Sequence, residues 1–150
     1  MRGLYLEDIA VGQIYRSRHI TVDADSINAF AAAFDPQSFH LEDDAARGSF
    51  FGGLVASGWH TAALTMRLLV ESEFAPAGGL IGAGVDELRW PRPVRPGDTL
   101  QVHGEVLGMR PSRSKPEQGV VRTRITTTNQ HGEAVQVFVA TLIVPRRPLA

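Results

Sequence analysis

Residues 119–144, GVVRTRITTTNQHGEAVQVFVATLIV, decide the fold because they predict two antiparallel strands joined by a tight turn. Over residues 121–128, Val, Thr, Ile and Thr at the odd positions alternate with Arg and Thr at the even positions. This period of two is typical of a strand with one covered and one exposed face. The sequence Asn-Gln-His-Gly at 129–132 indicates a short hairpin loop. The basis of the fold is therefore expected to be an antiparallel sheet.

Further strands are expected on the N-terminal side of this hairpin. The residue patterns predict strands over about 98–109 and 80–90, and another over about 15–22. Residues 111–118, rich in proline, serine and charge, are expected to form a longer, mobile loop. A sheet of this kind must bury one face against another element.

One apolar helix, predicted over residues 58–74, can supply that cover, and the proline and glycines of 76–79 should end it. A broad stripe along the helix is expected in the core, which makes Trp59 and Met66 packing residues rather than cofactor contacts. The stripe comprises Trp59, Ala62, Ala63, Met66, Leu69, Val70 and Phe74. We predict a single α+β domain over residues 1–150, in which a curved antiparallel sheet wraps around this helix. Because edges of such a sheet often pair with a second copy, a homodimer is expected.

Composition narrows the classes of partner. The chain has 150 residues, and its 15 Lys and Arg against 16 Asp and Glu give a formal net charge of -1. No overall field draws it toward nucleic acid or an acidic membrane surface, so the partner is expected to be a small molecule or another protein. The absence of cysteine excludes disulfides, thiolate zinc sites and cysteine nucleophiles, and the histidines show no metal-ligand spacing. With no signal segment or apolar run of membrane-spanning length, a soluble cytoplasmic protein is expected.

The segment 34–43, FDPQSFHLED, contains a candidate acid/base pair. A first helix is predicted from Asp23 as N-cap to about Phe34. Pro36 disfavours helical geometry in the residue before it, so Asp35 should lie at the helix terminus. His40 is expected in the loop beyond, where it can turn back toward the same cavity, and a short helix should follow over about 41–47. A carboxylate and an imidazole that share one water can transfer protons.

This segment resembles the motif of MaoC-type dehydratases, the group that includes (R)-specific enoyl-CoA hydratases and has the hot-dog fold. Their pattern is Asp-x-Asn-Pro-x-His-x-Asp, so Asp35 and His40 match in type and spacing, whereas Gln37 and Ser38 replace Asn and Pro. Residues 54–59, LVASGW, resemble the start of the family's central helix, with serine in place of its usual histidine. Residues 90–100, WPRPVRPGDTL, resemble its Pro-Val-x-x-Gly-Asp turn.

The resemblance implies addition or removal of water across the 2,3 double bond of an enoyl-CoA. Our hypothesis is that Asp35 accepts the water proton and that His40 holds the water and takes part in proton delivery. The backbone N–H of Gly58, at a helix N-terminus, would bind the thioester oxygen. The resemblance implies neither a metal nor a redox cofactor. Coenzyme A is expected only as the carrier of the acyl substrate.

Further substrate contacts are candidates at Ser57, Trp59 and Gln37, although capping of the helix is the favoured role for Ser57. Arg110, with Arg113 and Lys115 nearby, is a candidate contact for the phosphates of coenzyme A.

Two alternatives remain open on the same fold. In a hot-dog thioesterase, the carboxylate would activate water against the thioester carbonyl instead of the β-carbon. In a non-catalytic acyl-CoA binding subunit, the departures at Gln37, Ser38 and Ser57 would have displaced the pair. His60, one turn into the helix, is interpreted as a buried structural residue.

Overall fold

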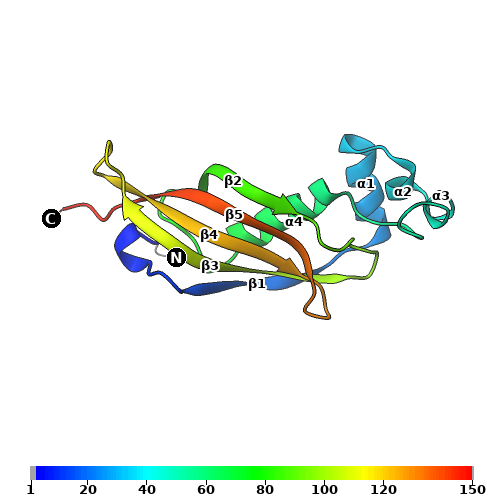
Figure 1. Ribbon diagram of the computed structural model, residues 1–150, viewed down its shortest axis with the longest axis horizontal. Helices are drawn as coiled ribbons and strands as arrows, with labels where there is room; N and C mark the ends of the chain where they lie inside the picture. Colours follow the sequence, from blue (N-terminus) through cyan, green and yellow to red (C-terminus); the bar gives the residue numbers. More distant parts are fainter. Residues whose placement is uncertain (1–2, 150) are drawn as a thin grey trace.

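A computed structural model describes residues 3–149, and its main feature is one antiparallel sheet with strand order β1-β3-β4-β5-β2 (Figure 1). The strands are β1 (Ile14–Thr21), β2 (Ile81–Arg89), β3 (Thr99–Pro111), β4 (Gln118–Thr128) and β5 (Ala134–Pro145). All five were predicted to within a few residues. β2 and β5 are far apart in the chain but are neighbours in the sheet, and within residues 3–149 β2 has no other strand beside it.

The hairpin of residues 119–144 forms as its sequence predicts. β4 pairs with β5 in antiparallel register, with Ile125 opposite Phe138. In the connecting turn, the side-chain oxygen of Asn129 accepts hydrogen bonds from the backbone N–H groups of His131 and Glu133. Gly132 has a φ of 73°, a left-handed conformation that favours glycine.

The helices are η1 (Leu6–Asp8), α1 (Ala24–Phe34), α2 (Ser38–Leu41), α3 (Asp43–Arg47) and α4 (Gly58–Val70). Asp23 caps α1 as predicted, because its carboxylate accepts a 2.7 Å hydrogen bond from the Ser26 N–H. The single helix expected over 41–47 is instead two short helices, separated by the extended backbone of Glu42. His40, expected in a loop, lies in the first of them, because the chain resumes helical turns directly after Gln37.

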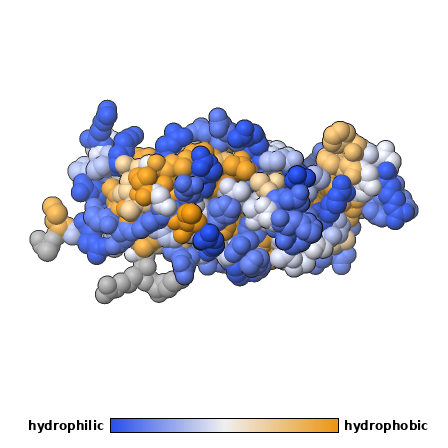
Figure 2. Space-filling model, turned by 60° about the horizontal axis from the view of Figure 1, so that its bottom comes forward, coloured by the Kyte–Doolittle hydropathy of each residue, from blue (hydrophilic) through white to orange (hydrophobic). Residues whose placement is uncertain are grey.

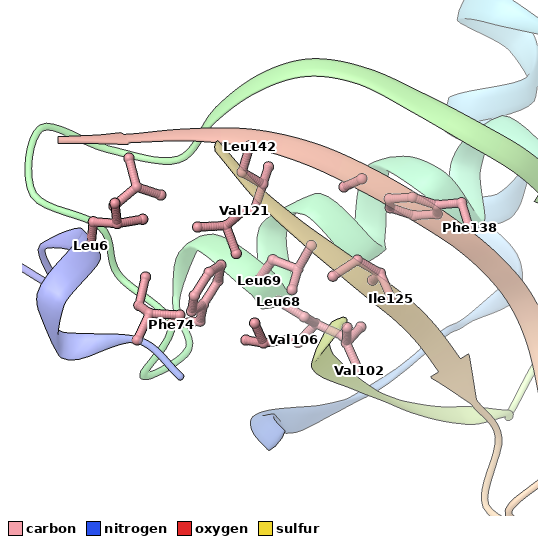
Figure 3. Packing of buried hydrophobic residues seen from close by; sticks show 13 residues of the cluster. Leu6, Leu68, Leu69, Phe74, Val102, Val106, Val121, Ile125, Phe138 and Leu142 are labelled. Carbon is pink, nitrogen blue, oxygen red and sulfur yellow. The ribbon is translucent and has the colours of Figure 1, made fainter. Parts of the chain in front are cut away.

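The central helix α4 is shorter than the predicted 58–74. It ends at Val70 because the Ser72 hydroxyl donates a 2.6 Å hydrogen bond to the Leu69 carbonyl and accepts one from the Phe74 N–H. Phe74 therefore packs into the core from a turn after the helix. There it lies with Leu68 and Leu69 against residues of the sheet, among them Val102, Val106, Val121, Ile125, Phe138 and Leu142 (Figure 3).

The predicted buried stripe on α4 is wrong in part. Trp59 is 58% exposed and Met66 is 49% exposed, and Val70 is exposed as well. The covered side of the helix carries polar as well as apolar residues, and Thr65 is hydrogen-bonded there to Thr127 and Gln136. The buried residues of α4 are His60, Thr61, Thr65, Leu68 and Leu69. Trp59 and Met66 are therefore not core residues, and an apolar face of α4 is left uncovered in the single chain.

A second hydrophobic cluster lies under α1 and α3 and supports the site described next. It consists of Val22, Ile27, Ala46, Leu54, Ala56, Val94, Leu100 and Val135. Hydrophobic side chains also reach the surface shown in Figure 2, left of centre and again at the end that carries α1, α2 and α3. None of the helices within residues 3–149 has the length and apolar character needed to span a bilayer.

Candidate active site

The structure brings Asp35 and His40 together. Asp35 is the C-cap of α1, and its own N–H still donates to the Ala31 carbonyl at 2.8 Å. After Pro36 the chain turns tightly, with the Gln37 N–H 2.7 Å from the Asp35 carbonyl oxygen, and enters α2. His40 Nε2 consequently lies 3.3 Å from Asp35 Oδ2. A carboxylate and an imidazole at this separation can share a proton or a bound water.

The ring of His40 is buried and held in one orientation. Its Nδ1 lies 2.7 Å from the Val55 carbonyl oxygen, which can only accept a hydrogen bond. Nδ1 therefore carries the hydrogen, and Nε2, which faces Asp35, is the atom that can gain or lose a proton. The edge-on contact with Phe39, 4.6 Å between ring centres, adds to this orientation.

Asp35 is kept in its charged form by its neighbours. Burial on its own would raise the pKa of Asp35, but hydrogen bonds from Gln37 and Ser57 and the positive charge of a protonated His40 together lower it below its ordinary value. The Gln37 amide nitrogen lies 2.6 Å from Asp35 Oδ1. Near neutral pH, Asp35 is thus a carboxylate that can accept a proton or bind a cationic imidazole.

The N-terminus of α4 faces the same region. Ser57 is the cap of this helix, since its hydroxyl oxygen accepts a 3.2 Å hydrogen bond from the Trp59 N–H. The next residue, Gly58, has a backbone N–H with no hydrogen-bond partner within residues 3–149. At a helix N-terminus, such a free N–H and the helix dipole both favour a negatively charged group.

A cavity of about 460 Å³ connects these features. Its lining includes His40, Ala56, Gly58 and Thr61, together with Phe50, Phe51 and the loop residues 90–95. Arg95 closes part of the rim, because its guanidinium donates a 2.8 Å hydrogen bond to the Phe51 carbonyl. The side chain of Arg92 is paired with Glu133 at 3.2 Å.

The remaining predicted contacts divide into two groups. Gln37 and Ser57 lie beside Asp35, whereas Trp59 points outward and touches Trp90 edge-on, with 5.1 Å between ring centres. Arg110 lies near the end of β3, at the opposite end of the molecule from α1, α2 and α3 (Figure 1). Within one chain, Arg110 is therefore far from the cavity.

Several residues of the cavity were not predicted. Thr61, Trp90, Arg92 and Arg95 line it, together with the two aromatic residues of the loop before α4. The turn over 90–100 resembles a family motif, and this resemblance could have predicted that its residues lie near the site. No local sequence pattern indicated Thr61 or the aromatic loop residues as part of the cavity.

His60 packs rather than lining the cavity. Its ring is stacked on Phe30 with 4.8 Å between centres and an angle of 9°. Burial lowers the pKa of His60, and the negative charge of Asp23 offsets part of this effect. This placement agrees with the structural role predicted for it.

Comparison with known proteins identifies the class. The model of the family described as MaoC like domain matches residues 8–129, and the chain belongs to this family. Its fold is the hot-dog fold, as predicted.

Individual relatives are consistent with this assignment. The crystal structure of the MaoC-like dehydratase from Rhodospirillum rubrum is 56% identical, with a TM-score of 0.94, over 98% of this chain and 100% of that chain. The R-hydratase PhaJ1 from Pseudomonas aeruginosa is 27% identical, with a TM-score of 0.77, over 99% of this chain and 92% of that one. The uncharacterized protein YdeM of Bacillus subtilis is 32% identical over 93% of this chain and 96% of its own length.

Proposed function

We propose that this protein is a hydro-lyase that adds water to, or removes it from, the 2,3 double bond of an enoyl thioester, with (R) stereochemistry at the hydroxyl carbon. The observation that carries the proposal is the 3.3 Å contact between Asp35 and a His40 that itself lines a cavity shared with the N-terminus of α4. Family membership supports the same class of reaction, as do relatives named for hydratase or dehydratase activity.

In the hydration direction, His40 Nε2 and the Asp35 carboxylate hold one water against the β-carbon. Asp35 accepts a proton from this water as its oxygen forms a bond to that carbon. The electrons of the double bond move toward the thioester, and negative charge grows on the thioester oxygen. The Gly58 N–H donates a hydrogen bond to this oxygen. The proton that Asp35 accepted passes to His40 Nε2, 3.3 Å away, and from there to the α-carbon, so that both side chains return to their starting protonation.

The proposed chemistry uses only groups of this chain, without a metal or redox cofactor. Coenzyme A or an acyl-carrier protein enters as part of the substrate. We assign the route of the carrier to the rim formed by Arg92 and Arg95, because the predicted phosphate contact Arg110 is remote from the cavity of its own chain.

We also propose that the protein is a homodimer. Met66 of α4 and Val85 of the edge strand β2 are exposed and line an apolar cavity of about 280 Å³ together with Phe138. Val70 and Ile81 are further exposed apolar residues on the same two elements. An exposed edge strand next to an uncovered apolar helix face is typical of a surface that a second copy covers.

The decisive experiment incubates the purified protein with a series of trans-2-enoyl-CoA thioesters and follows enoyl absorbance and free thiol together. Loss of absorbance without thiol release supports the hydratase. Thiol release would select the thioesterase instead. If neither the enoyl absorbance nor the free thiol changes while ligand binding is measurable, the protein is a non-catalytic acyl-CoA binding protein.

A further inference from the structure

A buried chain of hydrogen bonds links the core to the cavity wall. The indole Nε1 of Trp90 donates a 2.9 Å hydrogen bond to Gln136 Oε1. The amide nitrogen of Gln136 in turn donates to the Thr65 hydroxyl at 3.0 Å. The Thr65 hydroxyl lies 2.6 Å from that of Thr127 and donates to the Thr61 carbonyl at 2.8 Å. Gln136, Thr65 and Thr127 are all fully buried.

The geometry allows only one orientation of the Gln136 amide. An indole N–H can only donate, so the amide oxygen must face Trp90 and the nitrogen must face Thr65. Turning the amide over would place its NH₂ group against the indole N–H, two donors facing each other at a glutamine side chain that is fully buried. Because an unpaired buried polar group is costly, this network fixes the position of the Trp90 ring.

The Trp90 ring packs closely against the N-terminus of α4. A β-carbon built on Gly58 would lie 2.6 Å from Cε2 and 2.7 Å from Cδ2 of the Trp90 indole, well inside van der Waals contact. Glycine is therefore the residue that this contact permits. The ring also lines the cavity alongside His40, so its position determines both the cavity wall and the place of the Gly58 N–H.

We propose that Gln136 is a positioning residue for the reaction, acting through Trp90 on Gly58. This inference rests on the proposed function. Filling the core at this position does not by itself require a polar side chain, because an apolar side chain of similar volume could occupy the space, although Trp90 and Thr65 would then each lose a hydrogen-bond partner. Its specific role is to hold the indole so that the Gly58 N–H meets the thioester oxygen at the correct place. A donor shifted by a fraction of an ångström stabilises the enolate less.

The test compares two variants that each remove one polar group from the network. Gln136→Met keeps the approximate shape but removes the bond to Trp90. Thr127→Val removes a hydroxyl from the same network and leaves that bond in place. The readouts are the indole N–H signals of nitrogen-15-labelled tryptophan, kcat and KM for the enoyl-CoA substrate, and the thermal midpoint.

For Gln136→Met we expect one indole signal to move upfield and kcat to fall about tenfold, with a smaller change in KM. For Thr127→Val we expect a similar loss of thermal midpoint with both indole signals and kcat unchanged. Should Gln136→Met fail to fold, Trp90→Phe removes the same bond from its other end and is expected to lower kcat likewise.

Two results would overturn the inference: an unchanged kcat when the indole signal has moved, or an equal fall in kcat in Thr127→Val. A wild-type protein that is inactive across the whole enoyl-CoA series would instead overturn the proposed function. The indole signals would then still show whether Gln136 holds Trp90, so the two failures can be told apart.

Discussion

At the scale of single residues, the site depends on the proline-induced turn between Asp35 and His40. That turn was predictable, because Pro36 acts on its immediate neighbour and the effect is local. The anchoring of His40 by the Val55 carbonyl was not predictable, since the two residues are 15 positions apart and meet only in the fold.

Asp35→Asn is expected to reduce hydration by at least about a hundredfold, because an amide cannot accept the water proton. Enoyl absorbance measures the rate, and circular dichroism with the thermal midpoint checks the fold. Asp44→Asn, at a side chain that is 96% exposed, is the matched control and should behave as wild type. Full activity in Asp35→Asn would remove the proposed mechanism.

The pH dependence is a second test at this scale. The pKa of Asp35 is lowered in the fold, so the interactions of its carboxylate stabilise the protein above the ordinary aspartate pKa of about 4 and are lost as pH falls through the lowered value. Protonation of Asp35 should therefore lower the activity only at acid pH. Gln37→Met removes a hydrogen bond that lowers this pKa and should move the acid limb of kcat/KM to higher pH. An unmoved limb would show that another group titrates there.

At the scale of elements, the strands and the cap of α1 followed from local patterns, but the buried face of α4 did not. Periodicity shows that a helix has an apolar stripe, and it does not show what covers the stripe. The sheet covers the side with Thr61, Thr65 and Leu68. In the same way, the bond between Trp90 and Gln136 spans 46 positions and leaves no local signal.

The close contact between the start of α4 and the 90–95 loop makes Gly58 sensitive to a single methyl group. Gly58→Ala would place a β-carbon 2.6 Å from the Trp90 ring, so the ring or the helix must move. We expect a loss of stability of about 1–3 kcal/mol and a marked fall in kcat. Denaturant unfolding and steady-state kinetics measure the two effects. Gly48→Ala is the comparison, because the space around Gly48 is nearly open, with only the Ala45 carbonyl oxygen at 3.9 Å.

At the scale of the whole molecule, the homodimer is the main prediction. Light scattering or sedimentation should give twice the 16.3 kDa of the chain. Val85→Asp, on the exposed edge strand, should shift the equilibrium toward the monomer, because a charge would be buried without a partner. Val11→Asp alters a residue of similar exposure, 62% against 58%, that precedes β1, the strand at the opposite edge of the sheet from β2, and should leave the mass unchanged. A wild-type monomer at micromolar concentration would contradict the prediction.

The place of β2 in the sheet also governs when the chain can fold during its synthesis. β2 is made well before β5, yet β5 is the one strand that pairs with it in the part of the chain that the structure describes. Until β5 leaves the ribosome, β2 has no strand to pair with, and the apolar side chains of β2 and α4 lack Phe138, Ala140 and Leu142, which lie beside them in the folded protein. Such delayed, non-local pairing slows folding and exposes hydrophobic surface to other molecules. The nascent chain is therefore most vulnerable to aggregation between the synthesis of β2 and that of β5, and this is the interval in which a chaperone would matter most.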